Sequence, residues 1–338
     1  MKWLVTCFLV FSMLAAQASA DSGEALYSVI FSQEVMALGP DGTPYPSTTI
    51  NPEQIAGMQH YLFDLGRGRQ LVIETNISNA QERGLFGVAD AVKRCYQYVE
   101  AASGGTLKKG VLLYLIEFDE LPLSYAFEAA YPAEANWSEV RLALVRTGEP
   151  LIGPGAPLEL TDLLYDTLPH ELGHDILGEL PALRHDIDGR PSYYTRWFID
   201  GICELLAKGF ARQESPQLLQ RLLAMRNIGS VMERERIREQ VFVWEQHNTH
   251  AMDVESDLYG AAMLLLTVWT ERVPLDRLIG QIREQILPLD GAALRAMMEA
   301  VVGCDAEQVC QRADRAGKQL TRENVLTSRL EQSPRWGG

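Results

Sequence analysis

LPHELGHDIL, residues 168–177, contains two histidines four positions apart, with a glutamate directly after the first. On a helix, His170 and His174 project from one face, so both imidazoles can bind one metal ion. Glu171 lies about 100° further round that helix. From there it can take a proton from a water held by the metal. A chance match to this pattern is expected on the order of 0.01 times in such a chain. We therefore predict a site for one Zn²⁺ ion, with Glu171 as general base.

Pro169 precedes the first histidine directly. Proline disfavours helix at the residue before it and has no N–H to donate, so we expect the histidine helix to start or bend here. Apolar spacing and Gly or Pro breaks predict a mainly helical second half. The expected helices there cover residues 159–179, 192–210, 215–227, 230–246, 253–271, 274–287, 291–302 and 305–317.

The first half of the chain has a different pattern. β-Branched and apolar runs bounded by glycine and polar residues predict strands over 70–74, 110–118 and 139–145. A helix is expected over 79–102 from its apolar spacing. The fold class is therefore α+β. A strand-rich part covers 21–150, and a helical part covering 151–338 carries the metal site.

Two imidazoles do not complete a catalytic zinc site, which normally has three protein ligands and one open position. The metzincin pattern requires a glycine at 177 and a histidine at 180, but this chain has Leu177 and Leu180, which excludes it. Several acidic or imidazole side chains further on are candidates for the third ligand. They are Glu179, His185, Asp186, Asp188, Asp200 and Glu204.

The segment Trp197-Phe198-Ile199-Asp200-Gly201 resembles the second metal helix of the gluzincin metallopeptidases, the zincin group that includes thermolysin and the zinc aminopeptidases. The resemblance implies that Asp200 is the third ligand, at a position where the family has glutamate. It also implies that Glu204 orients a histidine ligand through a hydrogen bond. Because aspartate is one methylene shorter, the helix must come closer by about 1 Å or the metal must shift. The reverse assignment, with Glu204 on the metal, stays open.

The resemblance extends over about residues 70–275 and implies a zincin-like catalytic domain. Tyr259, in SDLYGAA at 256–262, matches the family's tyrosine that stabilises the oxyanion, with His247 and His250 as competing donors. The family also has an edge strand that holds an extended peptide by backbone pairing, a role that fits residues 139–145. The strand motif by which the aminopeptidases bind a free N-terminus is missing. An endopeptidase is therefore expected rather than an aminopeptidase.

Residues 1–20 have the features of a signal peptide: Lys2, an apolar stretch, and small residues at 18–20. Cleavage there would place the protein in the periplasm or outside the cell, where disulfides form. Four cysteines stay in the mature chain. Cys304 and Cys310 are the expected pair, because a helix capped by Asp305 with Gln308 brings them close. Cys95 with Cys203 is a second candidate pair.

The charge balance limits the partners. Thirty basic and 45 acidic residues give −15, or −16 without Lys2, which repels a phosphate backbone and excludes nucleic acid. The longest later apolar run, 261–269, is too short to cross a bilayer. The sequence therefore predicts an exported zinc-dependent peptidase acting on peptides or proteins. The alternative is a non-catalytic exported protein that uses a zincin scaffold as a zinc-binding module.

Overall fold

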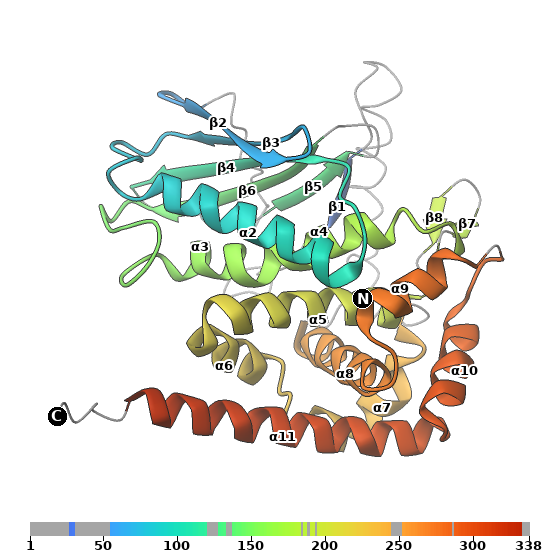
Figure 1. Cartoon of the computed structure of the whole chain (residues 1–338). Coiled ribbons are helices and arrows are strands. Elements are labelled where there is room, and N and C mark those ends of the chain that lie inside the picture. The colour runs from blue at the N-terminus through green and yellow to red at the C-terminus, as the bar shows by residue number, and fades with distance from the viewer. Residues whose placement is uncertain are drawn as a thin grey trace, which may run out of the picture. The chain divides into compact units, whose positions relative to one another are not determined.

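The computed structural model describes residues 27–30, 55–119, 128–132, 137–183, 185–187, 190–192, 195–244, 252–285 and 287–332. The chain divides into two compact units (Figure 1). The first comprises Met1–Arg94 and Lys108–Asp162, and the second comprises Cys95–Leu107 and Leu163–Gly338. The first unit contains a six-stranded mixed sheet and the second is mainly helical, so the α+β class is confirmed. The predicted signal peptide, 1–20, lies outside the described residues.

The sheet of the first unit has the strand order β1-β5-β6-β4-β3-β2. Strands β3, β4 and β6 are parallel to one another, and the remaining pairings are antiparallel. The strands are β1 (Tyr27–Ile30), β2 (Gln59–Gly66), β3 (Arg69–Thr75), β4 (Gly110–Phe118), β5 (Glu128–Pro132) and β6 (Trp137–Val145). The predicted strands at 70–74, 110–118 and 139–145 are therefore confirmed.

The expectation that residues 139–145 form an edge strand is wrong. Strand β6 pairs with β4 along its whole length and also with β5, through Glu139, Val140 and Arg141. The segment Glu128–Pro132 supplies this second neighbour, running antiparallel to β6. The backbone groups of β6 in this stretch are thus bonded to the sheet itself. In the described part of the sheet, the outer strands are β1 and β2.

Helix α2 (Leu85–Ser103) follows β3 and contributes its first half to the same unit. The rings of Phe86 on α2 and Phe63 on β2 pack edge to face, 5.9 Å apart. Many of the buried side chains of this unit are apolar residues of β3, β4 and the start of α2. They include Leu71, Ile73, Leu85, Val88, Val92, Val111, Leu113 and Leu115. The short helix α3 (Leu158–Asp162) ends this unit.

The described part of the second unit is mainly helical, with a small hairpin, and it includes the second half of α2. The other helices are α4 (Leu168–Leu177), α5 (Arg196–Glu214), α6 (Pro216–Met225), α7 (Glu235–Val241), α8 (Met252–Thr270), α9 (Leu275–Arg283), α10 (Gly291–Val302) and α11 (Ala306–Gln332). A π-helical turn η2 (Leu163–Thr167), two 3₁₀ turns η3 (Pro181–Leu183) and η4 (Val231–Glu233), and strands β7 (His185–Ile187) and β8 (Arg190–Ser192) complete it. Each predicted helix of the second half corresponds to one or more of these elements.

Two glycines allow α5 to pack closely between α4 and α8. A Cβ on Gly173 of α4 would lie 2.9 Å from the Sγ of Cys203 on α5. A Cβ on Gly201 of α5 would lie 2.9 Å from the carbonyl oxygen of Ala262 on α8. Contacts this short are not tolerated, so any larger residue would push the helices apart. The glycines of the HELGH and WFIDG segments therefore set the spacing of the helices that carry the candidate site.

The predicted Cys304–Cys310 disulfide is wrong, because Cys95, Cys203, Cys304 and Cys310 are all free thiols. The expected helix cap is correct, since the backbone N–H of Gln308 donates to Asp305 Oδ1 at 2.9 Å. Cys310 faces the core and is 3% exposed, whereas Cys304 lies before the helix and is half-buried.

Within the described residues, no helix is both long and apolar enough to span a membrane.

Candidate metal centre

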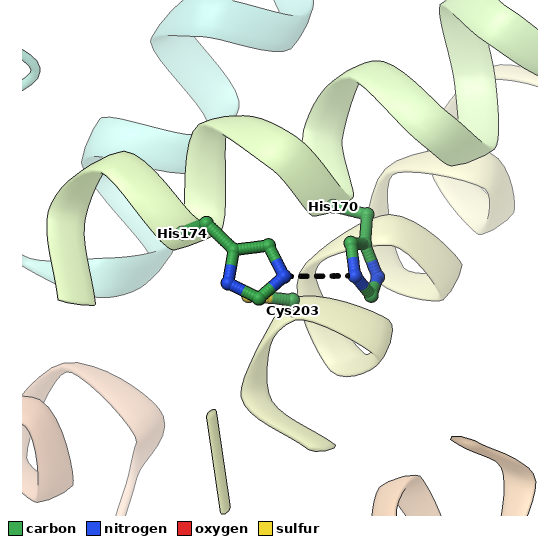
Figure 2. Close-up of side chains that lie close together, drawn as sticks. All are labelled: His170, His174 and Cys203. Carbon is green, nitrogen blue, oxygen red and sulfur yellow. Dashed lines mark hydrogen bonds between the residues drawn. The ribbon is translucent and has the colours of Figure 1, made fainter. Parts of the chain in front are cut away.

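The histidine helix begins where proline requires it. Pro169 occupies the first turn of α4, and the π-helical turn η2 directly precedes the helix. The expectation of a helix start at this point is therefore confirmed. One turn apart, His170 and His174 direct their Nε2 atoms toward each other at 3.1 Å (Figure 2). The Nε2 atoms of both imidazoles thus face the same small space beside α4, where one metal ion could be bound.

Asp200 approaches this space from α5. Its Oδ1 lies 3.2 Å from His174 Nε2 and 3.8 Å from His170 Nε2. With the 3.1 Å between the two nitrogens, these atoms form a triangle whose circumscribed circle has a radius of about 2.0 Å, close to zinc–nitrogen and zinc–oxygen bond lengths. The residues therefore fit a zinc ion bonded to all three atoms.

Glu204 contacts the other side of the first imidazole. Its Oε1 lies 3.1 Å from Nδ1 of His170, and the residue is 1% exposed. A metal-binding histidine commonly donates its second ring N–H to a carboxylate, which fixes the tautomer and the ring orientation. Of the two assignments that the sequence leaves open, the geometry favours Asp200 as the ligand and Glu204 as the residue that orients His170.

Cys203 is a neighbour that sequence reasoning placed only in a possible disulfide. Its sulfur and one ring nitrogen each of His170 and His174 all lie within 4.8 Å of one another, so this cluster could also hold a metal ion (Figure 2). Burial, together with nearby carboxylates, raises the pKa of the Cys203 thiol to about 11. A thiol must lose its proton to bind a metal. We favour Asp200 as the third ligand because its oxygen already lies 3.2 Å from His174 Nε2.

A buried network of cations surrounds Glu204. Lys208 Nζ lies 2.7 Å from Oε2, and Arg226 Nη2 lies 3.2 Å from Oε1. Lys208 also contacts Asp166 Oδ1, on η2, at 2.5 Å. Burial alone would raise the pKa of Glu204, but the charges of Arg226 and Lys208 and the hydrogen bond from His170 hold it well below its usual range. Glu204 is therefore ionised at neutral pH, as an acceptor for the His170 ring should be.

Arg196 links Asp200 to Tyr259. Its Nε donates to Asp200 Oδ2 at 3.0 Å, and its Nη2 donates to the Tyr259 hydroxyl at 3.1 Å. Burial would raise the pKa of Asp200, but the hydrogen bond from His174 and the charge of Arg196 lower it. The Tyr259 ring lies 5.7 Å from the His170 ring, so the structure brings this tyrosine to the site.

The remaining predicted residues are placed as follows. Glu171 lies in the first turn of α4 and is 1% exposed. Glu179 is exposed beyond the end of α4. Asp188, His247 and His250, and the side chains of His185 and Asp186, lie outside the described residues.

The sequence analysis did not predict the contacts that Arg196 and Lys208 make at the site. Their spacing could have indicated two of these contacts, because Arg196 and Asp200, and Glu204 and Lys208, lie four residues apart on one helix.

No protein-family model matches the chain, and no curated protein matches it. Among solved structures, it is similar to the crystal structure of an aminopeptidase N family protein from Idiomarina loihiensis, with a TM-score of 0.49 and 9% sequence identity. The match covers 76% of this chain and 46% of that one. This chain thus spans less than half the length of that structure.

Proposed function

We propose that this protein is an exported zinc-dependent peptidase with a zincin-like catalytic domain. The triangle of two imidazole nitrogens and one carboxylate oxygen carries the proposal, because it fits the bond lengths of one zinc ion. Glu204 on His170 Nδ1 supports it, since ligand histidines are usually held in this way. The signal-like residues 1–20 support export, and Asp21 is the expected first residue of the mature protein.

The side chains would divide the reaction as follows. His170, His174 and Asp200 would hold the zinc ion, which would supply Lewis-acid polarisation of a carbonyl and would lower the pKa of a bound water to about 7. Glu171 accepts a proton as the water oxygen bonds to the peptide carbonyl carbon. It then delivers that proton to the amine nitrogen as the carbon–nitrogen bond breaks. The Tyr259 hydroxyl donates to the oxyanion. Because Arg196 donates to the phenol oxygen, it polarises this donor further.

The proposed substrate is an internal peptide bond of a peptide or protein. An aminopeptidase must hold a free N-terminal amine, and the strand motif that does so in the zinc aminopeptidases is missing from this sequence. An endopeptidase needs only the extended backbone and side-chain pockets. We therefore propose endopeptidase over aminopeptidase activity.

One observation favours a second candidate, a non-catalytic zinc-binding module. Structural zinc sites fill all four positions with protein ligands, and Cys203 lies beside His170 and His174. If its thiolate joined Asp200 on the metal, no position would be open for a substrate. The carboxylate at Glu171 argues against this, because a structural zinc site does not need a general base.

The test compares wild-type protein with Glu171→Gln and with the matched control Glu179→Gln, an exposed glutamate just beyond α4. Metal content is measured by mass spectrometry and cleavage with a mixed peptide library. We expect one zinc ion in all three proteins, cleavage by wild type and control, and a loss of about 10²–10⁴-fold in Glu171→Gln. Bound zinc without any cleavage by wild type would support the non-catalytic module instead.

A further inference from the structure

We propose that Arg196 is a positioning residue of the metal site. In this role it determines which oxygen of Asp200 faces the two imidazoles and holds the Tyr259 hydroxyl beside the same point. The inference rests on the proposed zinc site. It goes beyond that site because nothing in the HELGH or WFIDG segments requires an arginine one turn before the ligand.

The planar guanidinium of Arg196 donates to two partners at once through different nitrogens. Its Nε donates to Asp200 Oδ2 at 3.0 Å, while its Nη2 donates to Tyr259 at 3.1 Å. The guanidinium also lies over the Trp244 ring, 4.2 Å from its centroid, which fixes the plane of these donors. A lysine ammonium has the same charge but cannot present two donors in one rigid plane.

The division of the Asp200 oxygens is the main structural argument. Oδ2 faces Arg196, whereas Oδ1 lies 3.2 Å from His174 Nε2. Without a partner on Oδ2, the carboxylate could rotate about Cβ–Cγ and offer either oxygen, or both, to the metal. A carboxylate ligand is held best when its second oxygen is hydrogen-bonded. Arg196, four residues earlier on α5, supplies that bond from the same helix.

This support matters more for aspartate than for glutamate. A glutamate at position 200 would reach further and could adjust with one more rotatable bond, whereas the shorter Asp200 must be presented accurately from a close helix. Gly173 and Gly201 provide the close packing of α5, and Arg196 provides the orientation of the carboxylate. The two features together account for a functional aspartate at this position.

The experiment measures zinc affinity by chelator competition, and the visible absorption spectrum of the Co²⁺ form, for Arg196→Gln and Arg196→Lys. The matched control is Arg295→Gln. Arg295 also lies over an aromatic ring, Phe242, at 4.9 Å, and its Nε bonds the carboxylate four residues on, Glu299, at 2.9 Å. We expect both Arg196 variants to bind zinc about 10–100-fold more weakly and to change the cobalt spectrum. Arg295→Gln should match wild type.

A double-mutant cycle separates positioning from general stability. In an Asp200→Ala background, Arg196→Gln should have no further effect on zinc affinity, because the carboxylate that it positions is gone. An equal loss in both backgrounds would overturn the proposal, as would unchanged affinity and an unchanged cobalt spectrum in the single variants. If Arg196→Gln does not fold, Arg196→Lys carries the same comparison. Wild-type protein that binds no zinc would overturn the proposed function and this inference together.

Discussion

Each unit of the molecule contains a deeply buried glutamate held by cations. In the first unit, Glu117 on β4 lies 2.6 Å from Arg83 Nη1 and 3.9 Å from Arg146 Nε. In the second unit, Glu204 on α5 lies 2.7 Å from Lys208 Nζ and 3.2 Å from Arg226 Nη2. Both carboxylates have side chains 1% exposed, so burial does not distinguish them.

The two glutamates differ in that Glu204 also contacts a histidine. Glu204 Oε1 is also 3.1 Å from Nδ1 of His170, whose opposite nitrogen faces His174 and Asp200. The ion contacts of Glu117 in the described structure are with arginines, and none of them is with a histidine. A buried charge is thus weak evidence for function by itself. A buried charge that also fixes the orientation of an imidazole is much stronger evidence.

We expect the largest loss of stability when the charge of Glu117 or of Glu204 is removed in separate variants. Glu117→Gln should destabilise the protein by about 3–5 kcal/mol, because Arg83, whose side chain is 11% exposed, stays buried without a counter-charge. It should leave zinc affinity unchanged. Glu204→Gln should destabilise the protein similarly and also weaken zinc binding about 10–100-fold. Denaturant unfolding and chelator competition measure the two quantities. Equal zinc affinities in the two variants would show that Glu204, like Glu117, is only structural.

A smaller effect should follow from changing the spacing of α4 and α5 without touching a charge. Gly173→Ala puts a methyl group 2.9 Å from Cys203 Sγ, so we expect a loss of about 1–3 kcal/mol and weaker zinc binding. The control is Gly280→Ala on α9, where a Cβ has nothing within 4 Å. That change should stabilise the protein by about 0.5–1 kcal/mol, as alanine does inside a helix. Thermal unfolding and zinc competition test both. A neutral Gly173→Ala would contradict the close packing.

The sequence predicted those elements whose signals are local. Strand β4 and helix α10 have the bounds that their apolar patterns indicated, and α10 begins at an Asp290 cap and ends at Gly303, which has φ +75°. The hairpin β2–β3 was missed because its two-residue turn, Arg67 and Gly68, has positive φ at both positions. Such turns are usually signalled by Asn-Gly, and arginine gives no such signal.

At the candidate site, too, the sequence predicted residues that lie close together in the chain but not the contacts between helices that are distant in sequence. His170, Glu171 and His174 follow from spacing on one helix. Their contacts with α5 and α8 depend on which helices pack together, which no spacing in the sequence specifies. The cations Arg226 and Lys208 were missed for this reason, although Lys208 had a signal four residues after Glu204. The predicted disulfide failed similarly, since a correct helix cap does not determine which way Cys310 faces.

Cys310 is a buried titratable group like Glu204, but burial keeps its thiol neutral. Cations hold the pKa of Glu204 well below its usual range, whereas burial raises the pKa of Cys310 to about 11. The Cys310 thiolate, the reactive form, should therefore be scarce at pH 7 and increase about tenfold per pH unit up to pH 11. In the folded protein, iodoacetamide should modify half-buried Cys304 first, and labelling of Cys310 should speed up with pH. Mass spectrometry under non-reducing conditions measures both. A disulfide-linked peptide containing Cys304 and Cys310 would show that the two thiols meet after all and that burial does not keep Cys310 free.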